Sequence, residues 1–334
     1  MRGGNLPAFL FDKLFFMCYH VFMTVNFGYC CINLELSERG VTTNRTMREA
    51  TYNERGIAYA SELAYKNTLD LISIMTWNQR NNIKVFRLSS DLFPWNSKYK
   101  LEDLPDYNDI ATNLKFAGDV ARRAGIRVTA HPDHFVKLAS DKQSVVDNAI
   151  HDLHHHNEVF SLMGFPANHY YCLNIHVGMN YSDKVITNFI NNFYKLNADT
   201  QTRLVVENDD KASAFSVKQL HTDIYSKIKT PITFDYFHHT FHPDSLSEFD
   251  AYNLAYRTWD CRPLFHYSES KSLHENIQCN PRAHSDYAST AVNTYGDSID
   301  IDLELKAKEK ALFKYVENVW TPLTNKALAG TIKE

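Results

Sequence analysis

Short apolar runs recur along the chain, and six of them end at or beside a histidine, an aspartate or a glutamate. A parallel strand buried on both faces has a nearly continuous apolar sequence, so polar residues are expected mainly at its ends. In a barrel of alternating strands and helices, the carboxyl ends of the strands share one face, which holds the active site. Seven residues of metal-ligand type stand at these ends, and we expect them to meet: His131, His176, Glu207, Asp235, His238, His266 and Glu304.

Eight segments have the length and composition of buried strands, and helical patterns lie between them. The strands are expected at 26–33, 84–88, 127–131, 173–177, 203–207, 232–235, 264–267 and 298–303. The helices are expected at 54–80, 108–124, 142–163, 184–196, 216–227, 245–256 and 305–315. This alternation predicts a parallel sheet. With 334 residues and no GxGxxG motif after the first strand, the fold class is predicted as α/β, an eight-stranded TIM (β/α)₈ barrel.

Residues 23–334 are interpreted as one barrel domain, and residues 1–22 as a separate extension. The extension is apolar, but Asp12, Lys13 and His20 interrupt it, so it fits neither a membrane span nor a signal peptide. A formal net charge of −4 means that any surface for nucleic acid has to be local. Six cysteines without a CxxC pair are typical of a reduced, intracellular and soluble protein.

The mixture of imidazole and carboxylate groups suits Mn²⁺, Zn²⁺ or Fe²⁺, whereas an all-oxygen set would indicate Mg²⁺ or Ca²⁺. Seven ligands exceed the needs of one ion, so two or three are expected. A lone histidine is more often structural, but clustered buried carboxylates are costly without cations. The other histidines carry less weight: the HDLHHHN segment (151–157) is interpreted as a solvated helix face, His239 and His242 as neighbours of the ligands, and His169 as lying at the opposite end of the barrel.

Several longer motifs together resemble the UV damage endonucleases, which are metal-dependent TIM-barrel repair enzymes. They are GYCCINLELSERGVTTNRTM, FRLSSDLFPW, TAHPDHFVKL, NIHVG, VVENDD, FDYFHH, RPLFHYSES, AHSDY and IDIDLELKAKEKAL, and the resemblance covers about residues 25–320. It implies hydrolysis of the phosphodiester 5′ of UV photoproducts, and of abasic sites as a further substrate. The implied partner is damaged double-stranded DNA. The protein is expected to be a monomer without an obligate protein partner.

The resemblance also assigns residues. Its metal ligands coincide with the seven strand-end residues, and its ion is Mn²⁺, with Zn²⁺, Mg²⁺ or Co²⁺ as alternatives. It implies that His134 and Phe135 probe the lesion, filling the gap left when damaged bases leave the stack. It places Tyr29 and Asn33 near the lesion pocket, and His284 close to the phosphate that is cut. The catalytic residues are accordingly expected to be His284, His266 and Glu207.

Three positions depart from the family pattern. His134 stands where the family usually has glutamine, which puts the lesion preference in question. Leu264 replaces a lysine that some members carry near the metals, and Lys98 replaces a further histidine ligand. A protonated lysine is a poor ligand, so the third metal site is expected to be weakened or reshaped.

Other functions remain open from the residues. A sugar isomerase or epimerase of the same fold would use similar ligands, but it has no need of the paired probing positions in HPDHF. An abasic-site endonuclease of the same barrel superfamily would share three-metal chemistry without the NRTM and RPxxHYS motifs. A barrel that only binds damaged DNA is the non-enzymatic alternative.

Overall fold

The computed structural model describes residues 24–274 and 278–324, and it confirms the predicted barrel. Eight strands pair in parallel in the order β6-β5-β4-β3-β2-β1-β8-β7. The circle is completed between β6 and β7 by an isolated parallel bridge between Asp235 and His266. The strands are β1 (Asn26–Cys30), β2 (Val85–Leu88), β3 (Arg127–Ala130), β4 (Leu173–Ile175), β5 (Leu204–Glu207), β6 (Ile232–Thr233), β7 (Leu264–Tyr267) and β8 (Asp300–Leu303).

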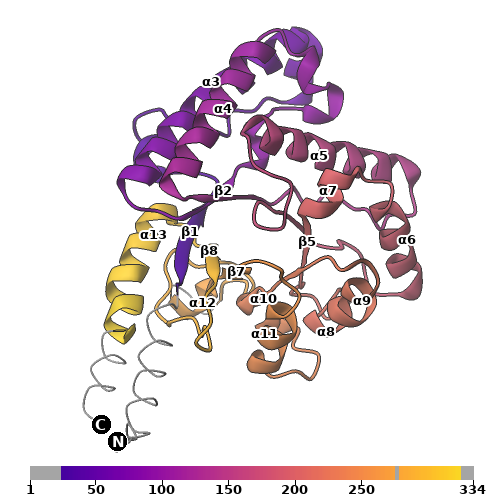
Figure 1. The fold of residues 1–334 in the computed structure, drawn as a ribbon, viewed down its shortest axis with the longest axis vertical. Coiled ribbons are helices and arrows are strands. Elements are labelled where there is room, and N and C mark those ends of the chain that lie inside the picture. Colours follow the sequence, from indigo (N-terminus) through magenta and orange to yellow (C-terminus); the bar gives the residue numbers. More distant parts are fainter. Residues whose placement is uncertain (1–23, 275–277, 325–334) are drawn as a thin grey trace, which may run out of the picture.

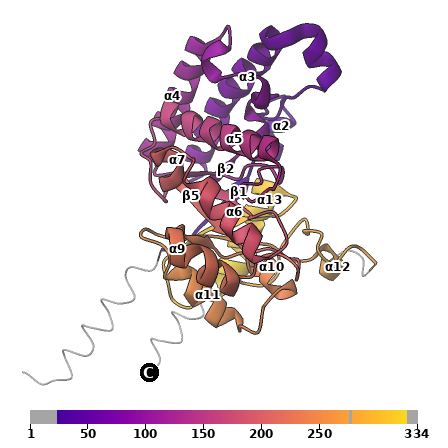
Figure 2. The ribbon, with the colours of Figure 1, turned by 90° about the vertical axis from the view of Figure 1, so that its right-hand side faces the viewer.

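Helices surround the strands, with α3 and α4 packed side by side and α13 lying along β1 (Figure 1). The longer helices are α3 (Glu49–Arg80), α4 (Tyr107–Ala124), α5 (Gln143–Leu162), α6 (Asp183–Phe193), α11 (Glu248–Tyr256) and α13 (Lys308–Tyr315). The shorter ones are α2 (Leu34–Ser37), α7 (Ala198–Arg203), α8 (Val217–Gln219), α9 (Ser226–Ile228), α10 (Tyr236–Phe241) and α12 (Lys271–His274). In Figure 2, α12 stands out from the body of the barrel. None of the helices within the described ranges is both long and apolar enough to cross a membrane.

The inside of the barrel is filled in layers. Val85, Cys172, Val205 and Leu264 form a fully buried apolar cluster contributed by segments around the barrel. Nearer the amino ends of the strands, Arg127 and Asp300 form an ion pair of 3.1 Å whose side chains have no solvent exposure. Arg262 contacts the second oxygen of Asp300 at 3.2 Å. The barrel interior is therefore a packed core, and the space for chemistry lies at the carboxyl ends of the strands.

The element boundaries differ from the prediction where the backbone changes direction. The first strand ends at Cys30, because Cys31 adopts a φ of 71° and turns the chain. Helix α3 begins at Glu49 and is interrupted at Gly56, which has a φ of 65° that only glycine adopts readily. Gly125 ends α4 in a left-handed cap, with a φ of 65° and a ψ of 35°. The predicted extension, residues 1–22, lies outside the described residues.

The prediction that HDLHHHN (151–157) forms a solvated helix face was wrong for two of its histidines. His155 and His156 in α5 are 6% and 8% exposed. His155 packs edge-on against Phe93, and His156 pairs with Asp152 at 3.3 Å. His155 therefore belongs to the packed interface between α5 and the segment that follows β2.

Candidate metal centre and active site

The seven strand-end residues lie together, as predicted. His131 and His176 directly follow β3 and β4, Glu207 ends β5, and Glu304 directly follows β8. Their ligand atoms form three overlapping groups, within each of which all atoms lie within 4.8 Å of one another. The groups are His131, His176 and Glu207; Glu207, Asp235 and His238; and Asp235, His266 and Glu304. The structure thus gathers the seven residues from six segments at one face.

Asp235 and His238 are placed by a short helix that the sequence did not predict. Asp235 stands at the N-cap of α10, where its Oδ1 accepts a hydrogen bond of 2.7 Å from the backbone N–H of His238. The cap leaves Oδ2 of Asp235 facing the centre without a hydrogen-bond partner. One helical turn therefore presents both residues to the same place.

Glu207 is at the middle of the cluster and is 1% exposed. Its Oε2 lies 3.1 Å from both His131 Nε2 and His266 Nδ1. Its Oε1 lies 3.3 Å from His238 Nδ1 and 4.0 Å from His176 Nε2. One carboxylate is therefore shared by four imidazole rings.

The carboxylates at the centre are held in the ionised form by their neighbours. Burial opposes the ionisation of Glu207, but His266 and His176 outweigh it and hold its pKa well below the usual range. Burial likewise opposes the ionisation of Glu304, and the guanidinium of Arg87 outweighs it, so the pKa of Glu304 is also well below the usual range. The centre thus offers negative charge in a place that water reaches poorly.

The imidazoles respond in the opposite sense. Burial alone would lower the pKa of His238, but Asp235 and Glu207 raise it well above the usual value. Burial is likewise outweighed at His266, where Glu207 and Glu304 raise the pKa to about 9. Among the carboxylates, Asp235 differs from Glu207 and Glu304, because burial raises the pKa of its carboxyl to about 6. Without ions, the centre draws protons onto its histidines to balance the carboxylates.

Several buried atoms of the centre lack hydrogen-bond partners, which native proteins generally avoid. The atoms are His176 Nδ1, Glu207 Oε1, Asp235 Oδ2, both ring nitrogens of His266, and His284 Nδ1. Among them, Glu207 Oε1, Asp235 Oδ2 and His266 Nδ1 face the centre and are atoms of the types that Mn²⁺, Zn²⁺ and Fe²⁺ accept as ligands. The residues present therefore fit divalent ions.

Two polar residues inside apolar strands were missed by the sequence reading. Asn174 in β4 donates a hydrogen bond from its side-chain amide to Glu207. Arg87 in β2 forms an ion pair with Glu304. The available signal was a polar letter in the middle of a run, LNI or VFRL, which is out of place in a purely apolar strand.

Two further carboxylates stand behind histidines of the centre. Asp209 Oδ1 lies 3.5 Å from His176 Nδ1. Asp302 Oδ2 lies 3.9 Å from His266 Nε2 and accepts a hydrogen bond of 3.2 Å from the hydroxyl of Thr129. A carboxylate beside the second ring nitrogen orients a ligating imidazole and fixes its tautomer.

His284 reaches the edge of the centre from the long segment between β7 and β8. Its Nδ1 lies 3.9 Å from Glu304 Oε2, and its backbone forms a bridge with Ser270. Glu269 holds this segment in place by accepting several hydrogen bonds, including one of 2.7 Å from the N–H of Thr290. Burial lowers the pKa of His284, so its ring is neutral at pH 7.

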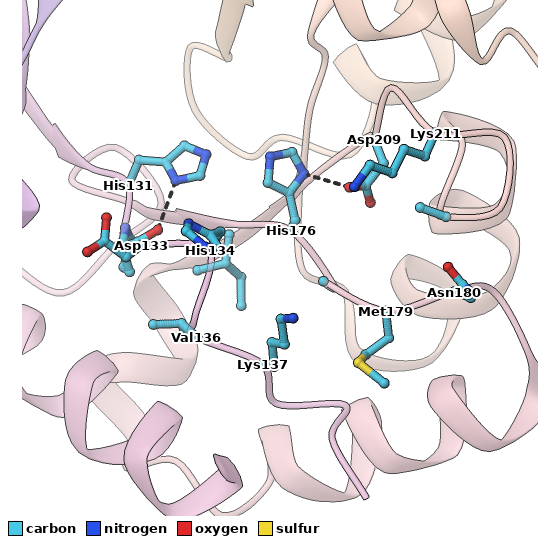
Figure 3. Close-up of a pocket in the computed structure, with 14 residues that line it drawn as sticks. His131, Asp133, His134, Val136, Lys137, His176, Met179, Asn180, Asp209 and Lys211 are labelled. Atoms are coloured by element: carbon cyan, nitrogen blue, oxygen red, sulfur yellow. Dashed lines mark hydrogen bonds and ion pairs between the residues drawn. The ribbon is translucent and has the colours of Figure 1, made fainter.

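His134 and Phe135 lie on the loop that follows β3. Phe135 is 71% exposed, and its ring centroid is 4.0 Å from that of His134. His134 also lines a cavity of about 200 Å³ that opens beside His131 and His176 (Figure 3). The loop that begins at His131 thus presents an exposed aromatic ring to solvent.

Tyr29 and Asn33, which the family resemblance places near the lesion pocket, make contacts inside the protein, and their role at a lesion stays a prediction. Both are fully buried. The hydroxyl of Tyr29 donates to Asn78 of α3 at 2.7 Å and accepts from Asn33 at 3.0 Å, while Asn33 caps α2 by accepting from the N–H of Leu36. The pair fastens β1 to the helices around it.

Lys98 and Leu264, which depart from the family pattern, both lie away from the ligand groups. Lys98 is exposed on a 3₁₀ turn, Asn96–Lys98, and belongs to none of the three ligand groups. Leu264 belongs to the apolar layer of the barrel, two residues before His266. Neither side chain supplies a ligand to the centre.

These features define a TIM-barrel protein with an imidazole–carboxylate centre at the carboxyl face of the barrel. The family model described as UV-endonuclease UvdE matches residues 25–327, and the chain belongs to that family. The UV-damage endonuclease of Schizosaccharomyces pombe is 32% identical over 86% of this chain and 49% of its own length. That of Neurospora crassa is 32% identical over 81% of this chain and 43% of its own length.

The fold comparison agrees with the sequence comparison. The crystal structure of SacUVDE has a TM-score of 0.74 at 30% identity, covering 89% of this chain and 97% of that chain. The chain spans about half the length of the two fungal relatives.

Proposed function

We propose that the chain is a metal-dependent DNA endonuclease that hydrolyses the phosphodiester 5′ of UV photoproducts in double-stranded DNA. The observation that carries this proposal is the set of three overlapping ligand groups at the carboxyl face, with an exposed aromatic ring beside it. Membership of the UV-endonuclease family and the names of the fungal relatives support the same substrate.

The seven strand-end residues would hold two or three divalent ions, which we propose to be Mn²⁺, with Zn²⁺, Mg²⁺ or Co²⁺ as alternatives. When bound, such ions activate water and stabilise the attacking and leaving oxygens of a phosphoryl displacement. We propose Glu207 and His266 as catalytic residues within this set. Glu207 belongs to two of the three ligand groups, and His266 belongs to the third. Asn174 and Arg87 fix the directions of the carboxylates that they contact.

His284 stands at the edge of the centre, where a phosphate would enter. Its neutral ring can donate one N–H to a phosphate oxygen while Glu304 faces the other side of the ring. His134 and Phe135 would fill the space left in the duplex when the damaged bases are turned out. A bent and weakly stacked lesion is cheaper to open than sound duplex, which gives selectivity.

The direct test is nicking of UV-irradiated plasmid by the purified protein with added Mn²⁺, beside unirradiated plasmid and plasmid with abasic sites. We expect nicks in irradiated plasmid, none in sound plasmid, and loss of nicking in EDTA. Binding of irradiated DNA without nicking, or nicking confined to abasic plasmid, would overturn the proposal.

A further inference from the structure

The cavity beside the metal centre carries two lysines that the proposed chemistry does not use. It lies between the segments that follow β3, β4 and β5, and its volume is about 200 Å³. Lys137 extends from the first segment toward the middle of the cavity, and Lys211 reaches inward from the third (Figure 3). His131 and His176 form its wall toward the centre.

Among residues 24–274 and 278–324, no carboxylate oxygen forms an ion pair with Lys137 or Lys211 within 4.0 Å. The two carboxylates of the cavity wall have other partners: Asp209 faces His176 at 3.5 Å, and Asp133 accepts a hydrogen bond of 3.1 Å from Ser90. Two positive charges are therefore available to an incoming anion.

The position of Lys137 depends on a glycine in the neighbouring segment. Gly178 has a φ of 76°, and a Cβ atom added there would lie 3.3 Å from Cγ of Lys137. The stem of Lys137 therefore lies close over the backbone at Gly178, which leaves it half-buried with its ammonium in the cavity. A half-buried lysine loses part of its hydration, and an anion would restore that stabilisation.

The size and lining of the cavity select the kind of anion. Sites for drug-sized organic ligands usually measure about 300–1,000 Å³, so this cavity suits a smaller group. It has no Phe, Tyr or Trp in its wall on which a nucleobase could stack. Phosphate groups are bound by lysine as a point charge, without the planar geometry that arginine requires.

We propose that this cavity binds a backbone phosphate of the DNA next to the one that is cut, with Lys137 and Lys211 as its contacts. The inference rests on the proposed function and adds a subsite to it. Phosphate contacts fix the position of a duplex but carry no information on its sequence or damage. The two lysines therefore hold the strand in register over the centre, while recognition of the lesion falls to other residues.

The test uses the full-length, Mn²⁺-loaded protein and the variants Lys137→Gln and Lys211→Gln. Lys195→Gln is the matched control, because Lys195 is exposed between α6 and α7 at the opposite end of the barrel. Binding of a sound duplex is measured by fluorescence anisotropy over a range of NaCl concentrations. Each cavity variant should reduce the slope of log K against log [NaCl] by about 1, because one phosphate contact is lost.

The kinetics on irradiated plasmid provide the second readout. Each cavity variant should raise KM and leave kcat unchanged, because the contact is the same in the ground state and the transition state. Lys137→Arg should retain the wild-type slope, since it keeps the charge. Circular dichroism checks that all variants are folded.

The result separates this inference from the proposed function. If the wild-type protein nicks irradiated plasmid but both cavity variants behave like Lys195→Gln, the phosphate subsite is overturned and the proposed function stands. A KM change on irradiated DNA without any change on sound duplex would also overturn it, because the cavity would then be reading damage. A wild-type protein that binds no duplex overturns both.

Discussion

Replacing Glu207 with glutamine is the sharpest test of how the ligand groups share their residues. The substitution keeps the shape of the side chain and removes its charge. Glu207 belongs to two of the three groups, so only the group of Asp235, His266 and Glu304 is left complete. We expect the wild-type protein to hold two or three ions and the variant one at most. His176→Gln breaks a single group and should cost one ion at most.

Elemental analysis of the purified proteins gives the number of ions, and nicking of irradiated plasmid gives the activity. If the lost ions contribute about 4 kcal/mol or more to the transition state, nicking by Glu207→Gln falls by about a thousandfold or more. Thermal unfolding followed by circular dichroism controls for misfolding. A folded Glu207→Gln protein that still holds two ions would refute the shared-ligand reasoning.

Three other changes test separate parts of the structure. Phe135→Ala should lower the ratio of cutting between irradiated and sound plasmid; an unchanged ratio would rule out its probing role. Asp300→Asn leaves the guanidinium of Arg127 buried without its partner, which should cost about 3–5 kcal/mol of unfolding free energy in urea titrations. Burial opposes ionisation of Asp152, but protonated His156 lowers the pKa of Asp152 to about 2, so this carboxylate contributes about 2 kcal/mol above pH 4, lost as the pH falls toward 2. Asp152→Asn should therefore lower the free energy of unfolding at pH 5, and by progressively less below pH 4. An equal loss of stability at pH 5 and at pH 2 would contradict the pairing.

The barrel could be predicted from the sequence because its strands are buried on both faces and most of them read as nearly continuous apolar runs. The ends of these runs are less visible. The first run continues through Cys31 and Ile32, yet the strand stops at Cys30, where the backbone turns to a positive φ. The cap at Asp235 and the helix α10 were likewise missed, because six residues are too few for a helical pattern to show.

The candidate ligands could be placed because they follow the strand ends, and their convergence was predicted correctly. The direction in which a side chain points inside a strand could not be read in the same way. Successive residues of a strand face opposite sides of the sheet. Tyr29 points outward to Asn78 of α3, a direction that its place in a family motif did not indicate. Arg87 points toward the centre, although its motif gave no reason to assign it a role.

The structure also explains why some site residues are better test positions than others. Strand β6 is only two residues long, and the barrel is completed by the bridge between Asp235 and His266, with a hydrogen bond of 3.0 Å from the N–H of His266 to the carbonyl of Phe234. Asp235 also caps α10. A change of the side chain at Asp235 therefore weakens the helix cap together with the ligand set, so lost activity there has two causes. The side chain of Glu207 caps no helix and closes no gap between strands, and the loss at that position reports on the centre.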